Sequence, residues 1–191
     1  MSNTHENVNN MPISVKSAYV YKKGQASLMS ITRTAVYGCA AMHPAEEDVM
    51  FSFGGYFSYN TGGTQDAFRF SSKDGETTVL RELPNLAYGY LITCTDFVKS
   101  DGTPAILLVG GSGKKSVFEY NIVSDFYVAK VELPEHSSRN DIVWHLGYFY
   151  YFAASKKIFK INAEFTQDWE EIGQDPNFGG NIHYMKVIPY F

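Results

Sequence analysis

The stretch PAILLVGGSGKKSVFEYNIVSDFYVAKVELP, residues 104–134, contains one complete unit of the pattern that decides the fold. It opens with an apolar run, 105–109, which is long enough for one strand buried on both faces. The doublet Gly110-Gly111 ends that run, and a polar turn follows it. Two further strands are predicted, Ser116–Tyr120 and Phe126–Leu133, and Pro134 closes the unit. The stretch therefore predicts consecutive antiparallel strands joined by short turns.

The landmarks of this unit recur earlier in the chain in the same order. An apolar strand ending in Gly-Gly, an aromatic–charged–aromatic triplet and a Glu-Leu-Pro triplet appear in both copies. The matching pairs are 49–55 with 105–111, 68–70 with 118–120, and 82–84 with 132–134. A leading strand precedes each doublet, within 33–42 and 87–97. Shared order at this level indicates an internal repeat.

A third copy follows with weaker landmarks. Its predicted strands are Arg139–His145, Tyr148–Phe152, Ile158–Ile161 and Trp169–Ile172, and Ala153-Ala154 stand where the glycines stood. The period is about 45–55 residues with four short strands per repeat, which is the pattern of a β-propeller blade. An aromatic fraction of 16% and 16 glycines also favour an all-β chain.

These motifs resemble the Kelch-type β-propeller repeat, which has an apolar strand ending in Gly-Gly, then an aromatic residue, then Trp or another aromatic. Tyr120 followed by Phe126, and Ile161 followed by Trp169, fit that order. The resemblance covers residues 33–173 and implies a Kelch-like propeller domain over 11–191, preceded by a polar arm, 1–10. We expect four blades, the last closed by a half-unit at 17–31 and a final strand at 182–191. The alternative is an incomplete propeller that another chain completes.

Composition excludes several classes of protein. The net charge is −4, so no basic surplus exists to bind nucleic acid. Residues 1–10 lack the order of a secretory signal, and no apolar run reaches transmembrane length. Cys39 and Cys94 lie within apolar strands and are predicted to be buried free thiols. We therefore expect a cytoplasmic protein that binds neither nucleic acid nor membrane.

No catalytic constellation is evident in the sequence. The five histidines lack metal-ligand spacing, and no Cys-x-x-Cys pair, nucleophile elbow or phosphate loop occurs. The acidic groups at 46–48 and 170–171 are interpreted as solvated turn and edge residues. The sequence thus predicts a protein that is not an enzyme and has no metal or cofactor.

The longest loop after a Gly-Gly strand, GGYFSYNTGGTQD at 54–66, carries Tyr56, Phe57 and Tyr59. In Kelch-like propellers this loop and the one before the innermost strand build the binding face. By that resemblance the second loop here is 135–140, which contains Glu135, His136 and Arg139. Tyr and Arg are residue types that carry binding energy at protein interfaces.

These residues are therefore the predicted binding site for a protein partner. The sequence favours a non-catalytic interaction module. A glycan-binding or glycan-processing propeller and a structural subunit of a larger assembly remain the alternatives.

Overall fold

The computed structural model describes residues 17–22, 25–30, 38–58, 62–84, 91–136 and 140–175. The first four-stranded antiparallel sheet has the order β3 (Cys39–Met42), β4 (Val49–Phe53), β7 (Ala67–Ser71), β8 (Thr77–Val79). The second contains β9 (Ile92–Val98), β10 (Pro104–Gly110), β11 (Val117–Asn121) and β12 (Phe126–Ala129). The third contains β13 (Asp141–His145), β14 (Tyr148–Phe152), β15 (Lys157–Asn162) and β16 (Glu170–Gln174). Two hairpins, β1 (Ser17–Lys22) with β2 (Gln25–Ser30) and β5 (Tyr56–Ser58) with β6 (Gly62–Gly63), complete the described strands.

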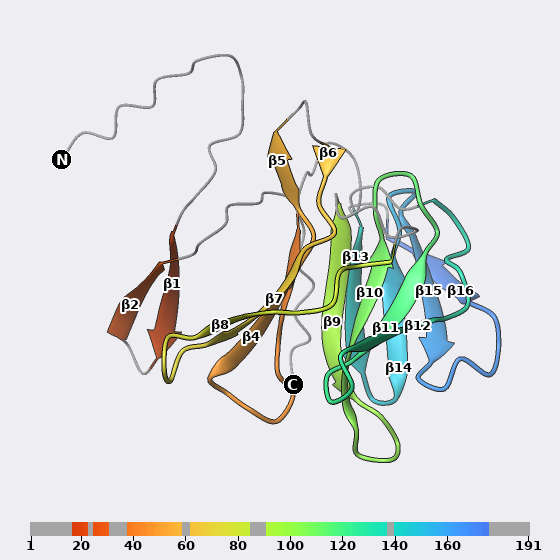
Figure 1. The fold of residues 1–191 in the computed structure, drawn as a ribbon. Coiled ribbons are helices and arrows are strands. Elements are labelled where there is room, and N and C mark those ends of the chain that lie inside the picture. Colours follow the sequence, from red (N-terminus) through yellow and green to blue (C-terminus); the bar gives the residue numbers. More distant parts are fainter. Residues whose placement is uncertain are drawn as a thin grey trace.

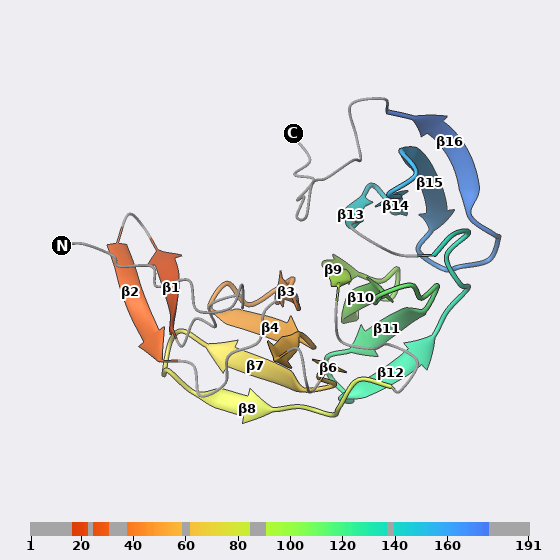
Figure 2. The same cartoon turned by 90° about the horizontal axis from the view of Figure 1, so that it is seen from above.

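The three large sheets are arranged as blades of a partial propeller (Figures 1 and 2). Seen from above, β3, β9 and β13 lie nearest the common centre, and β8, β12 and β16 lie outermost. The β1–β2 hairpin lies beside the first blade, at one end of the arc. Within these ranges no helix is long and apolar enough to cross a membrane. The predicted all-β propeller with four strands per blade is confirmed.

Two parts of the sequence-based prediction are not tested. The polar arm, 1–10, and the final strand, 182–191, lie outside the described residues. Closure of the ring by that strand therefore stays a prediction.

The second blade supplies the centre of the core. Along β10, Ile106 and Leu108 face the first blade, whereas Leu107 and Val109 face the third, and all four are at most 1% exposed. This two-sided burial follows from the strand's alternation between blades that cover both of its faces. The uninterrupted apolar run in the sequence is thus explained.

Aromatic rings fill the space between blades. Between the first two blades, the Tyr120 ring centroid lies 5.3 Å from that of Phe53 and 5.0 Å from that of Tyr127. Between the second and third, the Phe97 and Phe149 rings meet edge to face at 4.8 Å. Burial of one such ring contributes about 2–3 kcal/mol. The excess of aromatics in the sequence is therefore used at the junctions between blades.

A polar lock closes the outer part of the first junction. The Asp125 carboxylate accepts the Arg81 backbone N–H at 3.1 Å and the Tyr120 hydroxyl at 2.9 Å. The Tyr127 hydroxyl donates to the Arg81 carbonyl at 3.0 Å. Burial raises the pKa of both tyrosines, and the negative charge of Asp125 adds to that rise. These phenols stay neutral and act as hydrogen-bond donors between blades.

Two expectations about the chain need correction. Cys39 and Cys94 are not free thiols: they form a disulfide between β3 and β9, with 5.8 Å between their Cα atoms. The strand predicted over Phe126–Leu133 ends at Ala129. The chain leaves the sheet there because Leu133 turns into the core, where it is 2% exposed.

Both glycine doublets have positive φ angles, which explains why glycine stands at these positions. The φ angles are +62° and +120° at Gly54 and Gly55, and +84° and +99° at Gly110 and Gly111. Side chains other than glycine are strained in this region. A position not singled out from sequence, Gly38, makes a close backbone approach: a Cβ there would lie 2.7 Å from the Phe53 carbonyl oxygen.

We expect the substitution Gly110→Val to lower the free energy of unfolding by about 1–3 kcal/mol through backbone strain. Chemical denaturation measures this change. Gly75→Val is the matched control, because Gly75 has a φ of +74° and no atom lies within 4 Å of the place that its Cβ would take. Similar losses in both variants identify the backbone as the cause, and a Gly110→Val protein as stable as wild type contradicts the prediction.

Candidate binding face

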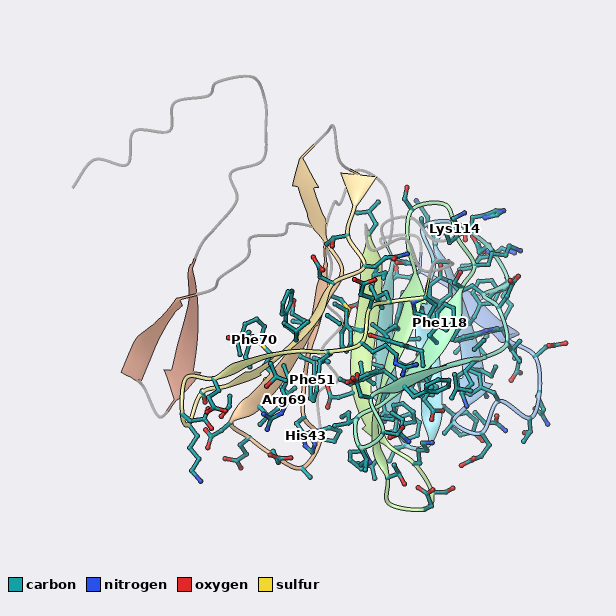
Figure 3. All side chains as sticks on the ribbon, in the orientation of Figure 1. His43, Phe51, Arg69, Phe70, Lys114 and Phe118 are labelled. Atoms are coloured by element: carbon teal, nitrogen blue, oxygen red, sulfur yellow. A yellow bond between two sulfur atoms is a disulfide. The ribbon has the colours of Figure 1, made fainter. Side chains whose placement is uncertain are left out.

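The propeller has two ends of different construction. We call the end bearing the loops 54–66, 110–116 and 153–157 the loop face, and the end bearing the turns 43–48, 99–103 and 146–147 the turn face. Figure 3 shows Lys114 at the first end and His43 with Arg69 at the other. Of the predicted binding residues, the backbone of Tyr56 and Phe57 and the residues Glu135 and His136 lie at the loop face.

Each loop on the loop face is closed by the same backbone hydrogen bond. The N–H after the second strand donates to the carbonyl where the third strand begins: Gly54 to Asp66 and Gly110 to Ser116, both at 2.8 Å, and Ala153 to Lys157 at 2.9 Å. Ala153 is therefore the structural counterpart of the glycines. Because all three loops are closed by this hydrogen bond, they differ in the residues that lie between the two hydrogen-bonded ends.

The connections between blades are tied to these loops. Leu83 N–H donates to the Gln65 carbonyl and Leu133 N–H to the Lys115 carbonyl, both at 2.8 Å. Each leucine is also buried, with 2% of its surface exposed. The Leu-Pro landmark of the sequence thus anchors the chain beside the loop before it enters the next blade.

Glu135 and His136 lie in the connection between the second and third blades. The Nδ1–H of the exposed His136 ring donates to the Gly113 carbonyl at 2.9 Å, which joins the connection to the neighbouring loop. Lys115 Nζ donates to the Pro134 carbonyl at 2.8 Å. Burial raises the pKa of Tyr151 and the hydrogen bond to Glu171 raises that of Lys157, and in both cases the negative charge of Glu135 adds to the rise. The structure therefore brings Glu135 and His136 between the loops of the second and third blades.

The positions of the other predicted binding side chains relative to Glu135 and His136 are not described. Tyr56 and Phe57 lie on β5, which pairs with β6, but their side chains are outside the described part of the chain. Tyr59 and Arg139 are also outside it. The structure does not test their role.

Two of the lysines on this face have partners that fix them. Lys157 pairs with Glu171 at 2.7 Å, so the pKa of the lysine is raised and that of the glutamate lowered by their hydrogen bond and opposite charges. Lys115 is held by Pro134, as described above. These lysines therefore contribute to the shape of the face as well as to its charge.

A buried polar layer lies beneath the loop face, next to the centre. Asn140 donates to the Tyr151 hydroxyl at 2.8 Å, and the Thr93 hydroxyl donates to the Asp141 carboxylate at 3.1 Å. Burial raises the pKa of Tyr151 to about 12, so this phenol stays protonated at neutral pH. The layer links β9 to β13 and supports the loops above it.

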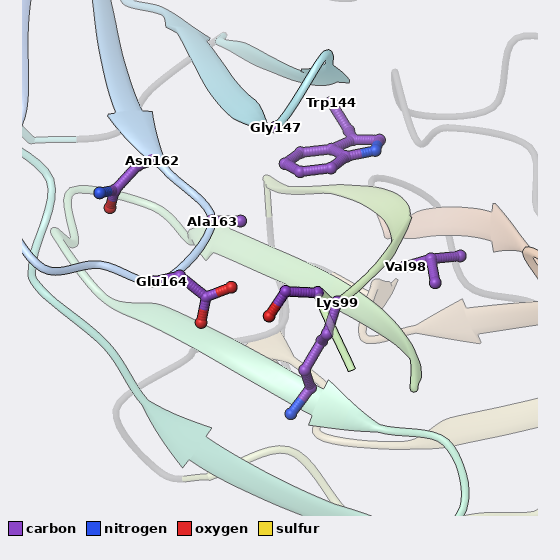
Figure 4. A pocket seen from close by; sticks show the side chains of 8 residues that line it. Val98, Lys99, Trp144, Gly147, Asn162, Ala163 and Glu164 are labelled. Atoms are coloured by element: carbon purple, nitrogen blue, oxygen red, sulfur yellow. The ribbon is translucent and has the colours of Figure 1, made fainter. Parts of the chain in front are cut away.

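The turn face has a small pocket that the sequence did not reveal. It has a volume of about 230 Å³ and lies between the second and third blades (Figure 4). The Trp144 ring lies on one side and the Lys99 and Glu164 side chains on the other. Lys99 is already bound to Glu119, and Asn162 to Thr166. Among the described residues no group of three His, Cys, Asp or Glu side chains could hold a metal ion.

Comparison of the sequence with protein-family models finds no match, and neither does comparison with curated proteins. Among solved structures, the chain is similar to "Structure of YjhT", with a TM-score of 0.64 and 11% sequence identity over 86% of this chain and 61% of that one. YjhT is a Kelch-repeat β-propeller protein. At this identity the similarity establishes the fold alone. The chain has a Kelch-type propeller fold and spans about three fifths of the length of YjhT.

Proposed function

We propose that this chain is a non-catalytic interaction module that binds a protein partner through its loop face. The observation that carries the proposal is the anchoring of Glu135 and His136 between two loops, through the His136–Gly113 and Lys115–Pro134 hydrogen bonds. A face held in one shape before binding loses less conformational entropy when a partner binds. The exposed His136 ring on such a face is suited to recognition.

The chemistry of the described titratable groups agrees with a role in binding. Tyr120, Tyr127 and Tyr151 have raised pKa values and serve as buried hydrogen-bonding groups. Glu119 is paired with two lysines. Groups fixed in this way support structure, whereas a general acid or base needs a pKa near the working pH.

The test is a pull-down from an extract of the source cells with wild type and with the triple variant Tyr56→Ala, Phe57→Ala, His136→Ala. We expect recovery of the partner to fall about thirtyfold, the loss of a contact worth about 2 kcal/mol. Val123→Ser is the matched control, since Val123 is 78% exposed on the turn face. Equal recovery by the triple variant and wild type contradicts the proposal. Arg139→Ala, tested alone, decides whether that residue belongs to the face.

The location of the protein is a separate proposal. The sequence favours the cytoplasm, but the Cys39–Cys94 disulfide favours an oxidising compartment, because cytosolic reductants keep thiols reduced. We propose the oxidising compartment. Blocking free thiols before lysis decides between them: a protein whose two cysteines react with the blocking reagent in the cell is in a reducing compartment.

A structural role has one specific observation in its favour. The described blades form an open arc, and the chain spans only 61% of YjhT. Propellers usually have about four to eight blades, so the three described blades do not make a complete ring. Assembly with another chain is therefore compatible with the interaction role, and the third blade indicates where it would occur.

A further inference from the structure

The side of the third blade that faces away from the second has the same pattern as the covered sides of the first two blades. Cross-strand register shows which positions are equivalent in the three blades. Phe51, Leu107 and Tyr150 are equivalent, because each lies on the second strand of its blade opposite a charged residue of the third strand. These charged residues are Arg69, Glu119 and Lys160. We call Val143, Tyr148, Tyr150 and Ile158 the bare side of the third blade. Their equivalents are Ala41, Val49, Phe51 and Ala67 in the first blade and Thr95, Ala105, Leu107 and Val117 in the second.

Exposure distinguishes the three blades at these positions. All eight equivalents in the first two blades are buried, at 7% exposure or less, because the next blade covers them. On the bare side, Tyr148 is 41% exposed and the other three residues are half-buried. Apolar side chains at blade-facing positions with partial exposure indicate a surface made to be covered.

A lysine at the middle of the bare side fits this interpretation. Lys160 occupies the position of Glu119, which is 3% exposed at the junction of the second and third blades. The Lys160 ammonium lies 5.1 Å from the centroid of the Tyr148 ring and 3.2 Å from the Glu170 carboxylate. Its alkyl stem covers apolar surface while its charge remains in water. The bare side therefore carries a charge that water can solvate when nothing covers it, and enough apolar surface to pack against another sheet.

The arc itself indicates what covers this side. Among the described residues, its two ends are the bare side and the β1–β2 hairpin, which lies next to the first blade where a preceding blade would lie. Two such arcs, joined end to end by a two-fold axis, bring six full blades into one ring, within the usual four to eight. A symmetric pair of this kind is a closed assembly with no end left uncovered.

We propose that the bare side of the third blade binds the β1–β2 hairpin of a second copy of the chain, so that two chains close one propeller. The contact continues the face-to-face packing already present between the described blades. It is independent of the loop face, since it involves the sides of the blades and not the loops at their ends.

Mixed cross-linking tests the proposal directly. One protein carries Tyr150→Cys, and a second carries Tyr19→Cys or Val20→Cys, neighbours on β1 that sample both faces of the strand. The native cysteines are bonded to each other and do not react with a bismaleimide. We expect a two-chain product when the two proteins are mixed. Leu146→Cys, 80% exposed on the turn face, replaces Tyr150→Cys in the control and should give none.

The mass in solution gives the second measurement. Light scattering should show two chains for wild type and for the control Leu146→Glu, and one chain for Tyr150→Glu with an unchanged circular dichroism spectrum. A wild-type protein of one-chain mass overturns the proposal. So does cross-linking that occurs only when both new cysteines are in the same chain, because the hairpin would then cover its own third blade.

Discussion

Loss of the Cys39–Cys94 disulfide should lower the free energy of unfolding by about 4 kcal/mol. The two cysteines are separated by 55 residues in sequence, and a cross-link over a loop of this length strongly restricts the unfolded chain. In the folded chain the bond joins the innermost strands of the first and second blades. The double variant Cys39→Ser, Cys94→Ser, compared with wild type by urea denaturation, measures the effect.

The control is the response to reductant. Dithiothreitol should destabilise wild type to the level of the double variant and leave the double variant unchanged, because only wild type has a bond to lose. If wild type is equally stable with and without reductant, or contains two reactive thiols after denaturation without reductant, the prediction is wrong.

The disulfide also shows what sequence analysis can recover at this junction. Once the repeat is aligned, both cysteines lie in innermost strands of successive blades. Strand alternation then turns Cys39, with Ala41, toward the second blade and Cys94 toward the first. Spacing along the chain contains none of this information, because the pairing depends on how two blades pack.

Other features were predictable because they are local. The Gly-Gly doublets require φ > 0, and the apolar run at 105–109 requires cover on both faces, so each fixes its own surroundings. The Asp125 lock and the close approach at Gly38 were not predictable, because their partners, Arg81 and Phe53, are set by tertiary packing. On the loop face, Glu135 and His136 were singled out by the family resemblance alone, and the Gly113 carbonyl that fixes the histidine was not predictable.

Glu119→Ala should lower the free energy of unfolding by about 2–3 kcal/mol. Glu119 is 3% exposed, and its carboxylate pairs with Lys99 at 2.5 Å and Lys130 at 2.6 Å. Removing one member of a buried ion pair costs about 3–5 kcal/mol when the remaining charge stays buried. The lysine side chains are 26% and 21% exposed, so water reaches the charges left behind and the expected loss is smaller than that.

The dependence on pH provides the sharper measurement. Burial alone would raise the pKa of Glu119, but the hydrogen bonds and charges of Lys130 and Lys99 outweigh it and hold the pKa below its ordinary value of 4.5. A carboxyl with a lowered pKa in the folded state stabilises the protein above pH 4.5, and this contribution is lost as the pH falls through the folded-state pKa. Wild type should therefore lose more stability than Glu119→Gln between neutral pH and acid below pH 4.5.

Glu171→Ala is the matched control for both measurements. Its partner Lys157 is also a lysine at 2.7 Å, but the two side chains are 41% and 37% exposed, and exposed ion pairs contribute little to stability. Both glutamates pair with lysine, Glu119 with two and Glu171 with one, and the contrast between them therefore tests the effect of burying a Glu–Lys pair. If Glu171→Ala and Glu119→Ala destabilise the protein equally, or Glu119→Gln keeps the acid sensitivity of wild type, the buried ion pairs of Glu119 with Lys99 and Lys130 do not stabilise the second blade as predicted.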